Sequence, residues 1–204
     1  MNYYFQQAIF QQSASSRKTL PEESGLEVAF AGRSNAGKSS VINALCSQKA
    51  LARTSKTPGR TQLINFFRLP DNNALVDLPG YGYAKVPEAM KLEWQKFIES
   101  YLLSRQTLRG LIVVMDIRHP LTSHDQTLLQ WAYSRQLPVH ILLNKADKLT
   151  RGAASNVMLQ VRKEMNLIDN VTVQTFSAAQ KQGLEQCWQL LERWLNRVDK
   201  NDNK

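Results

Sequence analysis

The sequence has little of what an exported or membrane-spanning protein needs. Its 204 residues include only two cysteines, Cys46 and Cys187. Both lie in apolar stretches with a helical pattern, so we expect packing side chains rather than a disulfide. The longest apolar run in the second half, residues 111–115, is far shorter than the roughly 18 residues of a membrane-spanning helix. The first residues also lack the basic start and apolar segment of a secretory signal, and we expect a cytoplasmic protein.

Acidic residues are missing from one long stretch. No Asp or Glu lies between Glu27 and Asp71, although the chain has 17 of them against 26 Lys and Arg, a net charge of +9. The basic residues of this stretch are Arg33, Lys38, Lys49, Arg53, Lys56, Arg60 and Arg68. Excess positive charge favours polyanionic partners, because contacts with phosphates supply affinity. A solvated basic face without a partner is the alternative.

The length fits a single domain, and the pattern of apolar residues predicts its class. Short runs of strand character alternate with longer segments of helical period, which is typical of an α/β, three-layer αβα fold with a mostly parallel sheet. The second and third strands are too close in sequence for a crossover helix, so one strand should be antiparallel. The six expected strands are residues 28–31, 63–67, 74–76, 111–115, 139–143 and 171–175. The expected helices are residues 38–46, 88–104, 123–135, 155–165 and 184–198.

The two ends of the chain differ in composition from the domain between them. Residues 1–23 are rich in Gln and Ser and should form an N-terminal extension that packs on the domain of residues 24–199. Residues 200–204 are polar, and we expect a disordered tail.

One face of the expected helix 88–104 should lie in the core. Its members are Met90, Trp94, Phe97, Ile98 and Tyr101.

A GxxxxGKS motif directly follows the first apolar strand and precedes a helix, the context that a phosphate-binding loop requires. The motif consists of Gly32, Arg33, Ser34, Asn35, Ala36, Gly37, Lys38 and Ser39, followed by Ser40. Its glycines let backbone N–H groups turn toward one concavity at a helix N-terminus. Lys38 should reach the outer phosphates, and the Ser39 hydroxyl should bind Mg²⁺. This phosphate loop predicts a nucleoside triphosphate without specifying its base.

A DxxG motif ends the third expected strand. It consists of Asp77, Leu78, Pro79 and Gly80. An aspartate in this place can hold a magnesium-bound water, and the Gly80 N–H can contact a γ-phosphate and lose it on hydrolysis. The motif is weak alone and becomes specific after a phosphate loop.

The base is indicated by NKAD at the end of the fifth expected strand, made of Asn144, Lys145, Ala146 and Asp147. The Asp147 carboxylate can accept from guanine N1–H and the 2-amino group, whereas adenine offers neither donor. Asn144 should brace the loops, and the stem of Lys145 should lie along the ring. After the last strand come Phe176, Ser177 and Ala178, where the Ala178 N–H should reach guanine O6. We call residues 144–147 the base loop.

Taken in order, GRSNAGKSS, TPGRTQ, DLPGYGYA, NKAD and SAA resemble the G1 to G5 motifs of translation-factor-type GTPases. Residues 24–199 are similar to the EngB (YihA or YsxC) family of bacterial ribosome-biogenesis GTP-binding proteins, within the TrmE-Era-EngA-EngB-septin-like superfamily. The distinctive words are KTPGRTQ at 56–62, DLPGYGY at 77–83 and DIRHP at 116–120. The resemblance implies a P-loop GTPase fold and a Mg²⁺-dependent GTPase with GTP and GDP as ligands.

The segment of residues 55–61 contains two threonines that could complete the magnesium shell, Thr57 and Thr61. The resemblance selects Thr61 as the second protein ligand beside Ser39, with Asp77 acting through water. It also implies nucleotide contacts from the surrounding residues, namely Gly59, Arg60, Thr61, Gln62 and Leu63. The expected catalytic set is Lys38, Thr61, Gly80 and Asn35.

Two residues bear on the rate. Tyr81 stands where Ras-like enzymes carry the glutamine that orients water, so intrinsic hydrolysis should be slow. Asn35 occupies the position of a monovalent-cation ligand in TrmE-like GTPases, which makes K⁺ a candidate cofactor. His119, in the DIRHP word, is expected to have a structural or partner-facing role.

The resemblance implies a role in assembly of the large ribosomal subunit, with ribosomal RNA as partner, and a requirement for normal septation in cell division. We expect a monomer that binds neither membrane nor DNA. The alternatives are a P-loop nucleotide kinase, a membrane-trafficking GTPase and a direct septation factor. The base loop argues against the kinase. The absence of a prenylation cysteine at the end, and of glycine after Met1, argues against a lipid anchor.

Overall fold

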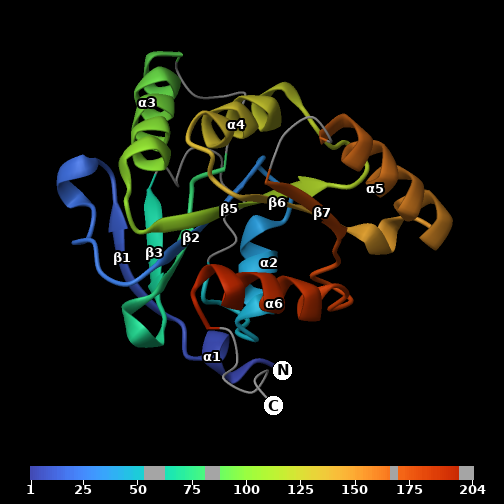
Figure 1. The fold of residues 1–204 in the computed structure, drawn as a ribbon, viewed down its shortest axis with the longest axis horizontal. Helices are drawn as coiled ribbons and strands as arrows, with labels where there is room; N and C mark the ends of the chain where they lie inside the picture. The colour runs from blue at the N-terminus through green and yellow to red at the C-terminus, as the bar shows by residue number, and fades with distance from the viewer. Residues whose placement is uncertain (53–62, 81–87, 166–169, 198–204) are drawn as a thin grey trace.

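A seven-stranded sheet runs through the middle of the computed structural model (Figure 1). The structure describes residues 1–52, 63–80, 88–165 and 170–197, apart from the side chains of residues 88–91 and 94. In chain order the strands are β1 (Ile9–Ala14), β2 (Glu27–Gly32), β3 (Ile64–Arg68), β4 (Ala74–Asp77), β5 (Leu108–Asp116), β6 (Val139–Asn144) and β7 (Val171–Thr175). Their order across the sheet is β1-β3-β4-β2-β5-β6-β7.

The pairing confirms a mostly parallel sheet with one antiparallel strand. β2 pairs in parallel with β4 and β5, and the parallel pairs β5·β6 and β6·β7 extend the sheet. β3 runs antiparallel to both of its neighbours, β4 and β1. The expected hairpin is therefore β3·β4, joined by a short 3₁₀ turn, η2 (Pro70–Asn72).

The expected number of six strands is wrong, because β1 adds a seventh at the sheet edge. It belongs to the predicted N-terminal extension and begins with three exposed residues, Ile9, Phe10 and Gln11. An edge strand that is covered along only part of its length does not need the alternating apolar pattern by which strands are recognised. Pairing with β3 therefore decides its structure.

Helices cover both faces of the sheet and complete the three layers (Figure 1). On one face lie α3 (Glu88–Ser104), α4 (Ser123–Ser134) and α5 (Arg151–Met165). On the other lie α1 (Tyr3–Gln6), α2 (Lys38–Leu45) and α6 (Leu184–Trp194). Two further 3₁₀ turns are η1 (Arg17–Thr19) and η3 (Ala146–Lys148). α3 has the expected bounds, α5 begins earlier than expected, and α6 ends at Trp194.

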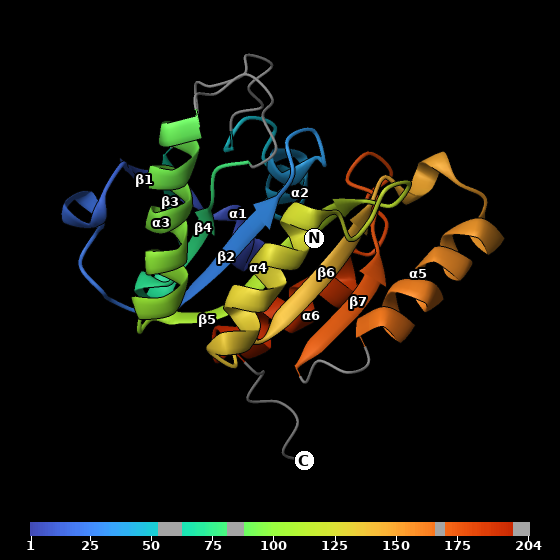
Figure 2. The same cartoon turned by 90° about the horizontal axis from the view of Figure 1, so that it is seen from above.

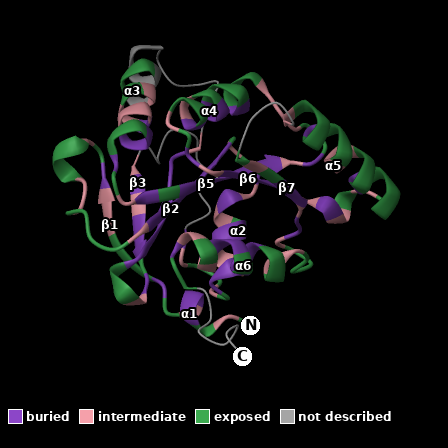
Figure 3. Cartoon of the chain, viewed as in Figure 1, coloured by how far each residue is buried: buried purple, intermediate pink, exposed green. Residues whose placement is uncertain are grey.

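Burial is concentrated in the sheet and on the helix faces that meet it (Figure 3). Every residue of β2 and β6 is buried, as expected for parallel strands covered on both sides. From the expected apolar stripe, Ile98 and Tyr101 lie in the core and Phe97 packs against it, whereas Met90 and Trp94 lie outside the described side chains. Cys46 and Cys187 are buried free thiols, which confirms that they are packing residues.

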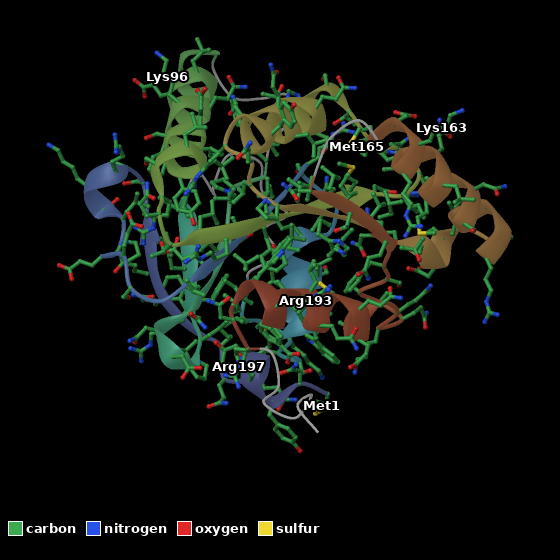
Figure 4. All side chains as sticks on the ribbon, in the orientation of Figure 1. Met1, Lys96, Lys163, Met165, Arg193 and Arg197 are labelled. Carbon is green, nitrogen blue, oxygen red and sulfur yellow. The ribbon has the colours of Figure 1, made fainter. Side chains whose placement is uncertain are left out.

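The N-terminal segment packs on the end of α6. Asn2 donates a hydrogen bond to Glu192 at 2.6 Å. The Arg197 guanidinium lies 3.6 Å from the centre of the Tyr4 ring, and Figure 4 places Arg197 on the side of the molecule where Met1 lies. Residues 2–14 thus contact the domain through the Asn2–Glu192 hydrogen bond and through the pairing of β1 with β3. The expected disordered tail, residues 200–204, lies outside the described residues.

The amino-terminal end of β2 carries a buried ion pair. The Glu27 carboxylate accepts hydrogen bonds from Arg105 Nε at 3.0 Å and Nη2 at 2.6 Å. It also accepts from the Tyr101 hydroxyl at 2.8 Å, and Arg105 Nη1 donates to the Pro21 carbonyl at 2.9 Å. Burial and the adjacent Glu27 carboxylate raise the pKa of Tyr101 well above its usual value. This network lies at the opposite end of β2 from the phosphate loop.

Candidate nucleotide-binding site

The loops that carry the predicted motifs follow the carboxyl ends of neighbouring strands. β2 leads into the phosphate loop, β4 into residues 78–80, β6 into the base loop, and β7 into residues 176–178. Because these four strands run in the same direction, the loops gather at one edge of the sheet (Figure 2). Open α/β sheets bind their ligands at this edge.

The phosphate loop needs its glycines for close packing. A Cβ on Gly32 would lie 2.6 Å from the Val114 carbonyl oxygen of β5. Gly37 has a φ of 94°, and a Cβ there would lie 2.4 Å from Asn144 Nδ2. Gly37 is the N-cap of α2 and makes no side-chain capping bond. The first N–H groups of α2 therefore have no side-chain cap, as an anion-binding helix terminus requires.

Lys38 joins the first two motifs. Its ammonium forms an ion pair with the Asp77 carboxylate at the end of β4, and both side chains are about nine-tenths buried. Gly80 packs on the phosphate loop, where a Cβ would lie 3.6 Å from the Ser34 backbone nitrogen.

Asn144 links three loops of the candidate site. It is buried on the last position of β6, and its side-chain amide donates to the Ala36 carbonyl at 2.8 Å. Its side-chain oxygen accepts from the Ala178 N–H at 3.3 Å. One residue thus sets the spacing between the phosphate loop, the base loop and the loop after β7.

Lys145 reaches back from the base loop toward the phosphate loop. It has a positive φ of 64°, and its ammonium donates to the Asn35 carbonyl at 2.6 Å. The same ammonium pairs with Asp116 Oδ2 at 2.9 Å. Asp116 was not among the expected site residues. In the sequence, the signal that could have identified it was its place directly after the expected strand 111–115. In the structure it ends β5 and pairs in register with Asn144 of the adjacent strand.

Asp147 is held ionised at the outer end of the base loop. Its Oδ1 accepts a hydrogen bond from the Ser177 hydroxyl at 2.5 Å, and the Lys148 ammonium lies 3.5 Å from Oδ2. The hydrogen bond from Ser177 and, to a smaller extent, the contact with Lys148 lower the pKa of Asp147. An ionised carboxylate is an acceptor only, which suits a ligand edge that presents two donors.

The structure brings together the expected residues from the first, third, fourth and fifth motifs. Ser39 is half-buried and Ser40 exposed in the first turn of α2, while Leu78, Pro79, Ala146 and Phe176 are buried beneath the loops. Leu63 is half-buried just before β3. The other expected residues of the second motif lie outside the described residues: Gly59, Arg60, Thr61 and Gln62. The same holds for Arg53, Lys56, Thr57 and Tyr81.

The described donors suit a hard cation that is shared with a ligand. Ser39 and Asp77 offer a hydroxyl and a carboxylate oxygen, and Mg²⁺ is commonly held by one or two such protein oxygens together with substrate phosphates. No group of three or more His, Cys, Asp and Glu able to hold a metal occurs among the described residues. Within the same residues, no helix is long and apolar enough to cross a bilayer.

Residues 27–145 match the model of a protein family described as 50S ribosome-binding GTPase. Among solved structures, a probable GTP-binding protein engB is 21% identical, with a TM-score of 0.68 over 84% of this chain and 100% of its own. A bacterial selenocysteine-specific elongation factor EF-Sec is 19% identical, with a TM-score of 0.61 over 88% of this chain and 30% of its own. A point variant of Aquifex aeolicus Era, bound to GDP and AlF4⁻, is 17% identical, with a TM-score of 0.62 over 88% of this chain and 58% of its own. These likenesses establish the fold.

Proposed function

Because the chain belongs to the family of 50S ribosome-binding GTPases, we propose that it is an EngB-type switch that uses GTP to assist assembly of the large ribosomal subunit. The observation that carries the proposal is the joining of phosphate loop and base loop through Asn144, which bonds Ala36 and Ala178. That arrangement suits one ligand with a phosphate end and a guanine end.

The phosphate end is proposed to bind Mg²⁺ through Ser39 and, by way of water, Asp77, with Thr61 as the second protein ligand. The metal would offset charge on the β- and γ-phosphates when bound. Lys38 would exchange its contact with Asp77 for the phosphates, and the Gly80 N–H would contact the γ-phosphate. Since Tyr81 cannot orient water as glutamine does, the proposed intrinsic rate is slow.

The guanine assignment is tested by Asp147→Asn. An amide replaces one acceptor with a donor, so affinity for GTP should fall by roughly 100-fold or more while affinity for xanthosine triphosphate rises. Isothermal titration with both nucleotides measures the exchange. Ser177→Ala is the matched control, because it removes only the hydroxyl that donates to Asp147 at 2.5 Å. This variant should bind GTP more weakly without binding xanthosine triphosphate more tightly. Unchanged GTP affinity in Asp147→Asn would remove the basis for guanine recognition.

Asn35 is proposed as a K⁺ ligand that compensates for the missing glutamine. A cation beside the phosphates would stabilise the charge of the transition state, as an arginine finger does. Hydrolysis should therefore be faster in KCl than in equimolar NaCl, and Asn35→Ala should abolish the difference. Equal wild-type rates in the two salts would reject this role.

We propose that the protein acts on the ribosome in the cytoplasm, as a monomer with ribosomal RNA as partner. The requirement for normal septation is proposed to follow from this ribosomal role. The net charge of +9 suits an RNA partner. Depletion followed by sucrose-gradient profiling tests this proposal. Immature large subunits should accumulate before cells lengthen; normal profiles in filamentous cells would instead indicate a direct role in septation.

A further inference from the structure

Two cations share the carboxylate of Asp116 at the end of β5. Arg118 contacts it with Nε at 2.9 Å, Nη2 at 2.6 Å and its backbone N–H at 3.1 Å. Lys145 contacts Oδ2 at 2.9 Å. The Arg118 side chain is 46% exposed and that of Lys145 28% exposed, whereas Asp116 is only 17% exposed. The carboxylate is therefore held between an outer cation and the lysine of the base loop.

Lys145 needs such an anchor because its side chain is long and flexible. A lysine side chain loses rotamer freedom when it is held in one conformation, and this loss opposes its ordering. Here its two ends are fixed by different means: the backbone by the loop, with a φ of 64°, and the ammonium by Asp116 and the Asn35 carbonyl. The methylene stem between them is thereby stretched from the base loop to the phosphate loop.

We infer that Asp116 is a positioning residue that holds the Lys145 stem where it covers the guanine ring and so slows release of the nucleotide. The inference rests on the proposed function, since it assumes a guanine nucleotide in the site. Arg118 supports Asp116 from the solvent side by fixing the plane of its carboxylate through two guanidinium bonds. Its contribution is indirect and smaller.

The test is a double-mutant cycle on release of a fluorescent N-methylanthraniloyl GDP from the full chain. Asp116→Asn keeps the shape but removes the charge, and should speed release roughly tenfold, equivalent to about 1.4 kcal/mol. Lys145→Met removes the ammonium and should speed release at least as much. If Asp116 acts through Lys145, the double variant should release no faster than Lys145→Met alone.

Two controls separate positioning from general loosening of the fold. Asp71→Asn removes a carboxylate that pairs with Arg197, away from the loops that follow the parallel strands, and should leave the release rate unchanged. Arg118→Ala should speed release by less than Asp116→Asn and should have no effect once Lys145 is methionine.

The outcomes are distinguishable. A wild-type protein that holds no fluorescent GDP would overturn the proposed function. If the wild type holds fluorescent GDP, two results would overturn this inference alone. One is release from Asp116→Asn at the wild-type rate, and the other is a double variant in which Asp116→Asn multiplies the effect of Lys145→Met.

Discussion

Two buried ion pairs lie at opposite ends of β2, and they are built differently. At its start, Glu27 and Arg105 are joined by several hydrogen bonds, with further support from Tyr101 and the Pro21 carbonyl. Beyond its end, within the described residues, Lys38 has one ion-pair contact, with Asp77. The first pair is satisfied by the protein and fixed in place. The second is a single contact, which we propose gives way to the phosphates of a bound nucleotide.

The largest effect on stability should come from breaking the fixed pair. Arg105→Met leaves Glu27 charged and buried without its partner, which typically costs about 3–5 kcal/mol, on the order of a third of the stability of a domain. Urea unfolding of the nucleotide-free protein measures the loss. The Glu27→Gln/Arg105→Met double variant should recover part of it, and a loss below about 1 kcal/mol in the single variant would contradict the comparison.

The exchangeable pair should differ from the fixed pair in its effect on stabilisation by a ligand. At about 100 times the dissociation constant, GDP should stabilise the wild type by about 2.7 kcal/mol. Arg105→Met should keep this increment although its starting stability is lower. Lys38→Met should lose most of it, because the phosphates lose their ammonium. Unfolding with and without GDP and Mg²⁺ measures both variants, and an intact increment in Lys38→Met would show that Lys38 does not contact phosphates.

His140 is a third buried polar group, neutral rather than paired. Its ring nitrogens lie 2.7 Å from the Thr172 hydroxyl and 3.0 Å from the Gln174 side-chain oxygen. Burial lowers the pKa of His140 to about 4. In the unfolded chain the pKa of His140 is about 6.5. As the pH falls, His140 therefore takes up a proton in the unfolded chain before it does so in the folded protein. The contribution of neutral His140 to the free energy of unfolding is therefore fully present above about pH 6.5 and is lost as the pH falls to about 4.

The stability of the wild type should therefore fall by up to about 1.4 kcal/mol more per pH unit than that of His140→Gln over this range. Both proteins share the same carboxylates, so the difference between their curves isolates His140. Chemical unfolding at a series of pH values gives the two slopes, and parallel curves would mean that His140 is not kept neutral by the fold.

The smallest effect should come from an exposed pair. Arg197 and Asp71 are 3.1 Å apart, with side chains 38% and 67% exposed. Asp71 has a φ of 61°, which asparagine tolerates, so Asp71→Asn removes charge without backbone strain. We expect a change of no more than about 1 kcal/mol, measurable by urea unfolding. A larger loss of unfolding free energy would show that solvent exposure does not distinguish a weak ion pair from a strong one in this protein.

The sequence located the motif loops of the candidate site, but not the interactions that support them. The phosphate loop and base loop could be located because their chemistry uses contiguous residues, and α3 could be bounded from its apolar spacing. The Glu27–Arg105 pair joins residues 78 positions apart, and Asp116–Lys145 joins different strand ends. Such pairs become visible only when the strand order is known. β1 was missed because pairing, rather than its own apolar pattern, determines it.

If this GTPase acts as the proposed assembly switch, it should bind large-subunit particles in a nucleotide-dependent manner. A ligand shifts an equilibrium only by the difference in its affinity for the two states, so a switch must bind its partner differently with GTP and with GDP. Pelleting with purified large-subunit particles, across a salt series, compares the protein loaded with a non-hydrolysable GTP analogue and with GDP.

We expect the GTP-analogue form to bind the particles more tightly than the GDP form. We also expect a log-log salt slope that falls by about 0.7 to 0.9 for each phosphate contact removed, as in Lys56→Ala or Arg53→Ala. Equal binding of the two nucleotide forms at every salt concentration would contradict the proposed switch.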